Sequence, residues 1–161
     1  MKKSGIITLV LAVALGFMSF ATFTESTKYK CMIQLTNYTG EGAYIVISLI
    51  NPKGEYDETL FMVGDDYEWY NTLEEWWKFY GKKRNNIDAI TGETIAGGER
   101  TIEVIAIDKA KIDAGYRIRF ETAVEDDKYH VGDVEFELTT ENIKAKHEGT
   151  GFIRYVRMMP N

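Results

Sequence analysis

The sequence predicts an all-β fold, an antiparallel β-sandwich with one short helix. Short segments rich in β-branched and aromatic residues recur along the chain, and Gly or Asp clusters separate them. The chain contains 2 prolines, so few positions are barred from a strand. One segment alone has a helical period, which predicts a low helix content.

The first 21 residues have the pattern of a secretory signal peptide. Two lysines precede an uncharged run over residues 5–20, and Ser19 and Ala21 are small residues at the positions that a signal peptidase reads. The run is shorter than the roughly 20 residues that span a bilayer, so an uncleaved anchor is the weaker alternative. We expect residues 1–21 to be removed and residues 22–161 to form a single β-sandwich domain outside the cytoplasm, periplasmic or secreted.

The composition narrows the classes of partner. Without the two N-terminal lysines, 17 (19 − 2) basic residues stand against 25 acidic ones. Nucleic acid is therefore not an expected partner, because binding it depends on basic side chains that neutralise phosphates. Cys31 is the only cysteine, which excludes an intramolecular disulfide, and its alternating surroundings indicate a small core residue. No second long apolar segment follows, so no membrane insertion is expected after signal cleavage.

Seven segments are predicted as strands. Residues 29–35 alternate between apolar and polar, whereas residues 43–50 are almost continuously apolar, as in a strand buried on both faces. A type I turn that starts at Asn51 and has Gly54 at its fourth position predicts a hairpin into residues 56–63. The later strands are expected at residues 100–107, 116–124, 133–138 and 151–159.

The helical segment carries an aromatic stripe at positions i, i+3, i+4 and i+7, formed by Leu73, Trp76, Trp77 and Tyr80. Thr72 and Glu75 form the pattern of a capping box, and Gly81 fits the position just past the end. The stripe has two interpretations. Trp76 and Trp77 either plug one end of the sandwich as core residues or form a platform for a flat ring system.

A long segment without a core pattern, residues 82–99, follows the helix, and loops of that length are often functional. Lys82, Lys83 and Arg84 concentrate positive charge at its start, which suits a phosphate-bearing cofactor. The same side chains also complement the dipole at the helix C-terminus, by about 0.3–1 kcal/mol.

The middle of this loop nearly matches a covalent flavin-attachment motif. The target of periplasmic FMN transferases reads Asp, two variable residues, Ser or Thr, Gly, Ala, then Thr or Ser. Asp88, Thr91, Gly92 and Thr94 match this pattern, and Glu93 replaces the Ala. In the alternative interpretation the segment is an ordinary turn, in which Asp88 caps backbone amides and Gly92 supplies a positive φ.

Several short motifs follow one another in a characteristic order: Ala43-Tyr44-Ile45-Val46, Asn51-Pro52-Lys53-Gly54, Trp76-Trp77, Asp88-Ala89-Ile90-Thr91-Gly92, Ala96-Gly97-Gly98-Glu99 and Ala114-Gly115-Tyr116. Together they resemble the predicted periplasmic proteins catalogued as domain of unknown function 2271. The resemblance implies an extracytoplasmic, immunoglobulin-like β-sandwich. It also implies flavin-based electron transfer, since members are often encoded near periplasmic FMN transferases and PepSY-type membrane reductases. The family's usual Trp-Asp-Gly after the next strand is replaced by Ala106-Ile107-Asp108-Lys109.

Two functions from different classes remain open. The first is an electron-transfer module that carries FMN covalently on Thr94 and acts with an FMN transferase and a PepSY-type reductase. Asp88, Thr91 and Gly92 would shape its acceptor loop. The second is a cofactor-free β-sandwich that binds another protein of the cell envelope.

Other chemistry has less support in the sequence. The 2 histidines lack a second ligand at zinc spacing, and no nucleophile elbow or phosphate loop occurs. We therefore expect no metal site and no catalytic residues, and we do not expect the chain to be an enzyme in its own right. The acidic turns at residues 65–66 and 125–127 could hold calcium, but solvated turns are the favoured interpretation.

Overall fold

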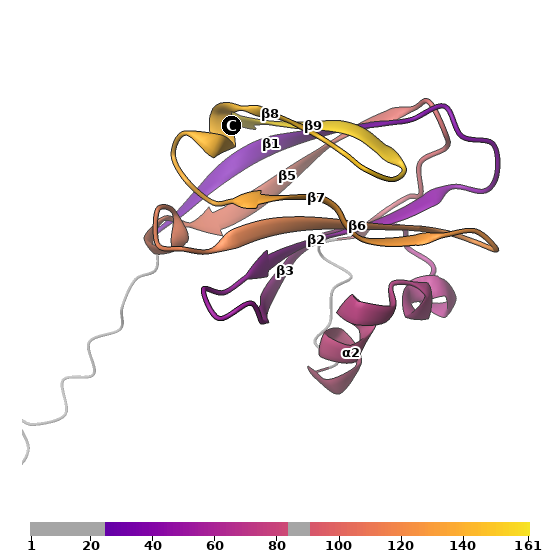
Figure 1. Ribbon diagram of the computed structural model, residues 1–161, viewed down its shortest axis with the longest axis horizontal. Helices are drawn as coiled ribbons and strands as arrows, with labels where there is room; N and C mark the ends of the chain where they lie inside the picture. The colour runs from indigo at the N-terminus through magenta and orange to yellow at the C-terminus, as the bar shows by residue number, and fades with distance from the viewer. Residues whose placement is uncertain (1–24, 84–90) are drawn as a thin grey trace, which may run out of the picture.

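The computed structural model describes residues 25–83 and 91–161, which form two β-sheets packed face to face (Figure 1). The strand order of the four-stranded sheet is β5 (Arg100–Asp108), β1 (Ser26–Leu35), β9 (Ile153–Pro160) and β8 (Lys146–Glu148). That of the five-stranded sheet is β4 (Thr91–Gly92), β3 (Tyr56–Val63), β2 (Ala43–Ile50), β6 (Arg117–Val124) and β7 (Tyr129–Glu137). Neighbouring strands are antiparallel, except that β3 and β4 are parallel. The predicted β-sandwich is confirmed.

An apolar core fills the space between the two sheets. Alternation along β1 directs Cys31, Ile33 and Leu35 inward, and all three are fully buried. Ile45 and Ile47 of β2 are buried opposite them in the same cluster. Burial raises the pKa of the Cys31 thiol, so this side chain stays neutral. Cys31 is a core residue, as its sequence context indicates.

Strand β2 lies at the centre of the molecule. All 8 of its residues are buried. Ile45 and Ile47 face the core between the sheets, whereas Tyr44 and Val46 face a second apolar cluster on the opposite side. This arrangement confirms the expectation of a strand buried on both faces and accounts for its nearly continuous apolar sequence.

The hairpin between β2 and β3 contains the predicted turn. The Gly54 N–H donates to the Asn51 carbonyl at 2.9 Å, and Gly54 has a φ of 85°, a conformation that favours glycine. The Asn51 side chain accepts from the N–H groups of Lys53 and Glu55 at 2.9 and 3.1 Å. These bonds fix the chain reversal and set where β3 begins.

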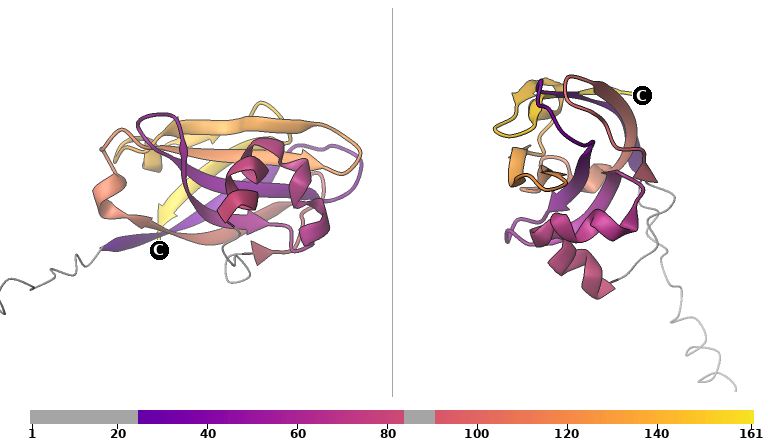
Figure 2. Two further views of the ribbon diagram at one scale, coloured as in Figure 1. Left: turned by 90° about the horizontal axis from the view of Figure 1, so that it is seen from below. Right: turned by 90° about the vertical axis from the view of Figure 1, so that its right-hand side faces the viewer.

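Two helical segments, η1 (Tyr67–Thr72) and α2 (Glu74–Lys83), cover the outer face of the five-stranded sheet as a third layer (Figure 2). Leu73 and Trp76 are fully buried there, in one cluster with Val46 and Met62 of the sheet. The expectation that the tryptophans plug one end of the sandwich is therefore wrong. The helix lies across a sheet face because the outward side chains of β2 and β3 are themselves apolar and need a cover.

The ends of α2 differ from the predicted capping pattern. The Thr72 hydroxyl donates to the Trp69 carbonyl at 2.6 Å, within η1. The Glu75 N–H donates instead to the Tyr129 hydroxyl of the sheet at 3.0 Å. No capping box forms, since a tyrosine from β7 takes the bond that Thr72 was expected to accept. Gly81 lies inside α2 and not beyond its end.

The other predicted strands are present, with shifted bounds in places. β7 begins at Tyr129, earlier than expected, because Tyr129 and His130 pair with β6. The short strands β4 and β8 were not predicted. Two single turns of 3-10 helix, η3 (Lys109–Lys111) and η4 (Asn142–Lys144), connect β5 to β6 and β7 to β8.

Candidate functional site

The predicted flavin-attachment loop ends in a segment that is fixed to the edge of the five-stranded sheet. β4 runs parallel to the end of β3. The Gly92 carbonyl accepts a hydrogen bond from the Gly64 N–H at 2.6 Å, and the Ile95 carbonyl accepts one from the Ala43 N–H at 2.7 Å. Thr94 therefore lies between two points at which the backbone is held.

The Thr94 side chain is exposed and rests on the backbone of Gly42. A Cβ atom at position 42 would lie 2.6 Å from Thr94 Oγ1, closer than side chains tolerate. Gly42 thus permits the loop before β2 to approach the candidate acceptor. The result is an exposed side chain on a fixed backbone, with its Oγ1 on the side of Gly42.

A glycine turn fixes the chain just after the candidate acceptor. A Cβ atom at Gly97 would lie 2.0 Å from the Tyr38 carbonyl oxygen, so a larger residue does not fit. Gly98 has a φ of 80°, and its N–H donates to the Thr36 carbonyl at 2.8 Å. The Tyr38 hydroxyl donates to the Ile95 carbonyl at 3.2 Å. The two glycines therefore hold this segment against the loop that links β1 to β2.

Gly92 does not act as a turn residue. It lies in β4 and is not among the glycines with a left-handed φ. A Cβ atom there would make ordinary contact with the Phe61 ring, at 3.7 Å. The interpretation of Gly92 as a turn glycine is wrong, because the backbone at this position pairs as a strand.

Other residues of the predicted site are described in part or not at all. Lys82 and Lys83 are the last residues of α2, and only their backbone is described. The same holds for Thr91 in β4. Arg84 and Asp88 lie outside the described residues. The roles expected of these five side chains stay predictions.

Trp76 belongs to the aromatic cluster beneath α2. Its side chain is fully buried, and its Nε1–H donates to the Thr59 hydroxyl at 2.8 Å. The Tyr80 ring stacks on it at a centroid distance of 4.7 Å and an interplanar angle of 6°. Trp76 thus has no exposed ring face to offer a ligand; it is a buried residue, as one interpretation expected, but beneath α2 and not at an end of the sandwich.

Trp77 is only partly buried, on the side of α2 that faces η1. The Tyr67 ring meets it edge-on at 5.5 Å, and Tyr67 is one of the large exposed hydrophobic side chains. The pair is accessible, so of the two predicted platform residues only Trp77 can still contact a ring system from outside.

Acidic side chains surround one end of the sandwich. Desolvation and the negative charges of Asp126, Glu41 and Asp66 raise the pKa of the Glu125 carboxyl. Glu41 directly precedes Gly42, the glycine that Thr94 contacts. Glu93 directly precedes Thr94 and is exposed. An incoming phosphate would therefore meet carboxylates from two segments of the chain.

A buried carboxylate lies between α2 and the sheet, at a position where no sequence pattern predicts one. Glu121 of β6 is fully buried, and its oxygens accept from the hydroxyls of Tyr56, at 2.5 Å, and Tyr129. Burial raises the pKa of Glu121, although both tyrosines and Arg119 stabilise its ionised form. Arg119 in turn donates to Glu135 at 2.6 Å. The network links β3, β6, β7 and, through Tyr129, the start of α2.

A second buried carboxylate, Asp133, has a purely structural arrangement. It accepts from the Thr122 hydroxyl at 2.6 Å and from the N–H groups of Gly151 and Ile153 at 2.7 and 2.9 Å. These bonds attach the turn before β9 and the first residue of β9 to the middle of β7. Because the Asp133 oxygens already accept several hydrogen bonds within the protein, they have little capacity to bind a ligand.

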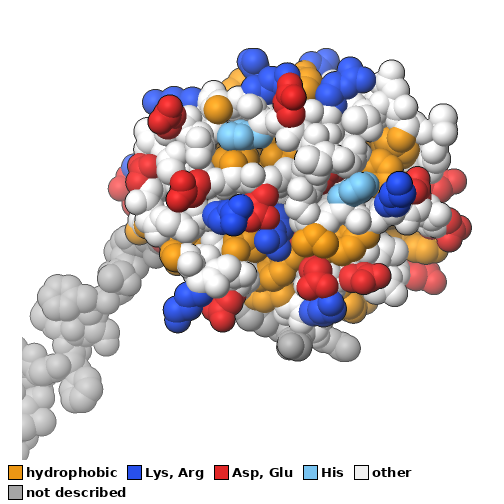
Figure 3. Space-filling model, in the orientation of Figure 1, with side chains coloured by type: hydrophobic (Ala, Val, Ile, Leu, Met, Phe, Trp, Pro, Cys, Tyr) orange, Lys and Arg blue, Asp and Glu red, His pale blue; other side chains and the backbone are white. Residues whose placement is uncertain are grey.

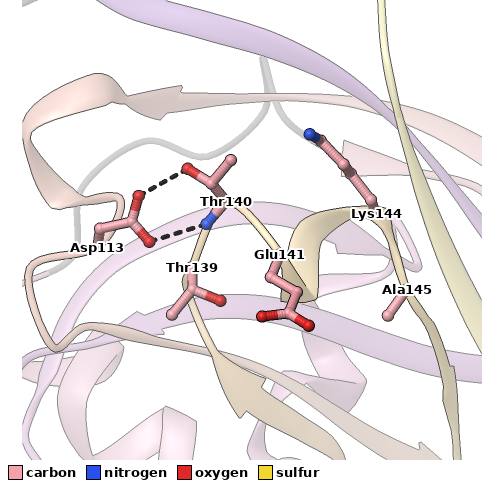
Figure 4. Close-up of a pocket in the computed structure, with 6 residues that line it drawn as sticks. All are labelled: Asp113, Thr139, Thr140, Glu141, Lys144 and Ala145. Atoms are coloured by element: carbon pink, nitrogen blue, oxygen red, sulfur yellow. Dashed lines mark hydrogen bonds between the residues drawn. The ribbon is translucent and has the colours of Figure 1, made fainter.

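An open depression is lined by loops at the other side of the fold (Figure 4). Asp113 is its most polar feature, and its carboxylate accepts from the N–H and the hydroxyl of Thr140 at 2.9 and 2.6 Å. These bonds lower the pKa of Asp113. The remaining lining residues are Thr139, Glu141, Lys144 and Ala145. None of them belongs to the predicted flavin site, and Asp113 is occupied in closing a loop.

The described segments offer neither a metal site nor a membrane span. In residues 25–83 and 91–161, no group of three or more His, Cys, Asp or Glu side chains is arranged to hold a metal ion. The acidic turns therefore gain no support as a calcium site. No helix in the same residues is long and apolar enough to cross a membrane.

The comparisons with known proteins give one result. The sequence model of the family described as "Predicted periplasmic protein (DUF2271)" matches residues 26–155. No curated protein and no solved structure matches the chain. The match extends from the start of β1 into β9 and so includes nearly all of both sheets. The chain belongs to the DUF2271 family of predicted periplasmic proteins.

Proposed function

We propose that this protein is an extracytoplasmic carrier of covalently bound FMN, with Thr94 as the acceptor. The single observation that carries the proposal is the accessible Thr94 side chain on a backbone fixed by Gly92 and Ile95. In the attachment step the Thr94 hydroxyl gives its proton to a base of the transferase and its oxygen bonds to the FMN phosphorus of a flavin dinucleotide, while the pyrophosphate bond of that donor breaks and AMP leaves. Once bound, FMN would supply the redox chemistry of electron transfer, and the protein would hold it outside the membrane.

The negative charge of Glu93 opposes attachment of a phosphate to Thr94, and the repulsion energy has an upper and a lower bound. A phosphate on Thr94 would lie within a few Å of the Glu93 carboxylate. Two unit charges about 4 Å apart repel by about 1 kcal/mol in water and by about 4 kcal/mol at the effective dielectric of a protein surface. The penalty slows modification without preventing it. A transferase that contributes Mg²⁺ would screen the phosphate further.

The flavin ring would remain at the surface of this protein. Trp76 is excluded as a platform because it is fully buried against Tyr80. Trp77 and Tyr67 form the accessible aromatic pair that supports contact with a ring system. An exposed flavin suits a carrier that passes electrons to a membrane reductase, since the ring must approach its redox partner closely.

Co-expression with a periplasmic FMN transferase in an oxidising compartment tests the proposal. We expect the purified protein to gain the mass of one FMN adduct and to absorb near the flavin maximum. Thr94→Ala should abolish the adduct and leave the fold intact, because this side chain is exposed. Glu93→Ala should raise the yield by removing the nearest negative charge.

Matched variants separate the acceptor from its surroundings. Thr140→Ala removes another exposed threonine, outside the motif, and should leave the adduct unchanged. Thr91→Ala should lower the yield less than Thr94→Ala does. An unlabelled Glu93→Ala variant, in the presence of an active transferase, would contradict the proposal.

A cofactor-free interaction domain of the cell envelope is the second candidate. Exposed apolar side chains on the four-stranded sheet favour it, since Ile102, Val104 and Met159 are uncovered. This function becomes the answer if no flavin is found on protein from the native host.

A further inference from the structure

The outer face of the four-stranded sheet has a charge opposite to that of the chain as a whole. Direct cross-strand neighbours place five cations on this one face: Lys28, Lys30, Arg100, Lys146 and Arg157. All five are exposed. Glu148 of β8 and Asp108 of β5 are acidic side chains on the same face. We call this surface the basic face, in a chain with 19 basic and 25 acidic residues.

The basic face is also apolar. The large exposed hydrophobic side chains of the described residues are Tyr67, Ile102, Val104 and Met159, and the last three lie on this face. Their relative exposures are 55% for Ile102, 46% for Val104 and 41% for Met159. Val104 and Met159 flank Lys30 in one cross-strand row. Apolar side chains thus lie next to cations on the outer face of the sheet.

The cations of the basic face are poorly neutralised by the protein itself. Arg157 and Lys146 lie directly opposite each other, a like-charge pairing that is unfavourable in a sheet. Lys146 has two partial compensations: an ion pair with Glu148 at 3.0 Å and a position over the Tyr155 ring, 4.9 Å from its centroid. The Arg100 guanidinium contacts Met32 Sδ at 3.9 Å, which neutralises no charge. An external anion would relieve these contacts.

We propose that the basic face binds peripherally to an anionic phospholipid surface. Figure 3 shows Lys and Arg side chains gathered along the upper margin of the molecule, over β8 and β9, whereas acidic side chains are spread over both ends and the lower part. This uneven distribution of charge favours the approach of the basic face to a negative surface. Exposed Ile, Val and Met side chains then enter the interfacial region while the lysines contact headgroup phosphates.

A membrane fits this surface better than an acidic protein does. The face is the open side of a sheet, and the depression lined by Asp113 and Lys144 lies on other loops. Lys28 and Lys30 present point charges on flexible stems, which suit a fluid array of phosphates more than a fixed set of carboxylates. The proposal stands independently of flavin attachment, because no residue of the basic face belongs to the Thr94 segment.

Vesicle sedimentation of the full processed protein tests the proposal. We expect binding to phosphatidylcholine vesicles that contain phosphatidylglycerol, little binding to phosphatidylcholine alone, and release at high salt. Lys28→Glu with Lys30→Glu should lower the partition coefficient by about tenfold or more, since each basic residue near an anionic surface contributes about a factor of five. Ile102→Ser with Val104→Ser should weaken the binding that persists at moderate salt.

A charge-matched control uses exposed lysines away from the basic face. Lys53→Glu with Lys128→Glu changes the net charge equally, from loops of the five-stranded sheet, and should alter binding far less. Equal loss in both double variants would overturn the proposal, because it would show a net-charge effect without a specific face. Binding to an acidic polypeptide with none to anionic vesicles would also overturn it. Circular dichroism of each variant verifies that the fold is kept.

Discussion

The outer faces of the two sheets differ in what covers them. On the five-stranded sheet, Tyr44, Val46 and Met62 are buried beneath η1 and α2. On the four-stranded sheet, Ile102 and Val104 have no such cover and remain exposed. Both outer faces therefore carry apolar side chains. Of the two, the face of the five-stranded sheet is the one that a helical layer covers. An apolar sheet face without a cover is either a defect or an interface, and the surrounding cations favour an interface.

Covering the face of the five-stranded sheet removes one carboxylate from water, which the open face of the four-stranded sheet avoids. The helical layer encloses Glu121, which would have faced solvent on a bare sheet, and the two tyrosine hydroxyls satisfy its oxygens. On the open face, the charged side chains at equivalent outward positions keep their hydration. One sheet therefore gains stability through aromatic burial and tyrosine hydrogen bonds, whereas the other keeps its charges accessible.

The largest expected difference between the faces comes from removing a large side chain from each. Trp76→Ala leaves a cavity beneath α2 and should lower the free energy of unfolding by about 3–5 kcal/mol. Ile102→Thr on the open face should change it by no more than about 0.5 kcal/mol, since the side chain is exposed and stays β-branched. Denaturant unfolding measures both. Similar losses in the two variants would remove the distinction between covered and open faces.

A smaller effect is expected from deleting one hydroxyl on each face. Tyr129→Phe leaves a Glu121 oxygen and the Glu75 N–H without their partner, at a cost of about 1–3 kcal/mol. Tyr155→Phe, on the four-stranded sheet, should cost no more than about 0.5 kcal/mol. If Tyr129→Phe were equally neutral in urea unfolding, the buried network would contribute nothing to holding α2 in place.

The pH dependence of stability should distinguish the buried carboxylate. Because the folded-state pKa of Glu121 is raised above 4.5, the folded protein binds its proton more tightly than the unfolded chain does. This contribution is fully present below pH 4.5 and is lost as the pH rises through the folded-state pKa. The stability of Glu121→Gln relative to the wild type should therefore rise between the unfolded and folded pKa values, with a slope of up to about 1.4 kcal/mol per pH, and then level off. A difference that is independent of pH would mean that the pKa of Glu121 is not raised.

The smallest predicted effect concerns the like-charged pair of the open face. Arg157→Gln removes a cation opposite Lys146 and should raise the free energy of unfolding by about a few tenths of a kcal/mol at low salt. Salt should screen this gain, and Arg157→Lys should not reproduce it. Thermal unfolding at two salt concentrations measures the effect, and a loss of stability in Arg157→Gln would show that the arginine is already compensated within the protein.

The strands were predictable because their signal is local. Continuous apolar sequence in residues 43–50 and the turn at Asn51 and Gly54 depend on neighbours in the chain, and the structure has both. β4 and β8 escaped prediction because two or three residues carry no periodicity. The capping box at Thr72 failed for the opposite reason, since a distant tyrosine bonds the Glu75 N–H.

The candidate site was less predictable than the fold. Thr94 of the motif is exposed, but periodicity could not tell that Trp76 would be buried and Trp77 partly accessible. Glu121 alternates with buried residues of β6 and therefore resembles a solvent-facing position. Its burial depends on a helix that precedes it by many residues, and a local pattern contains no such information.

The intact mass of the protein purified from the periplasm of its native host tests the central claim most directly. We predict a mass increase of one FMN, located by peptide mapping to the fragment that contains Thr94 and absent from the Thr94→Ala variant. An unmodified wild-type mass, in cells whose transferase labels another target, would contradict the claim and leave the cofactor-free interaction domain as the function.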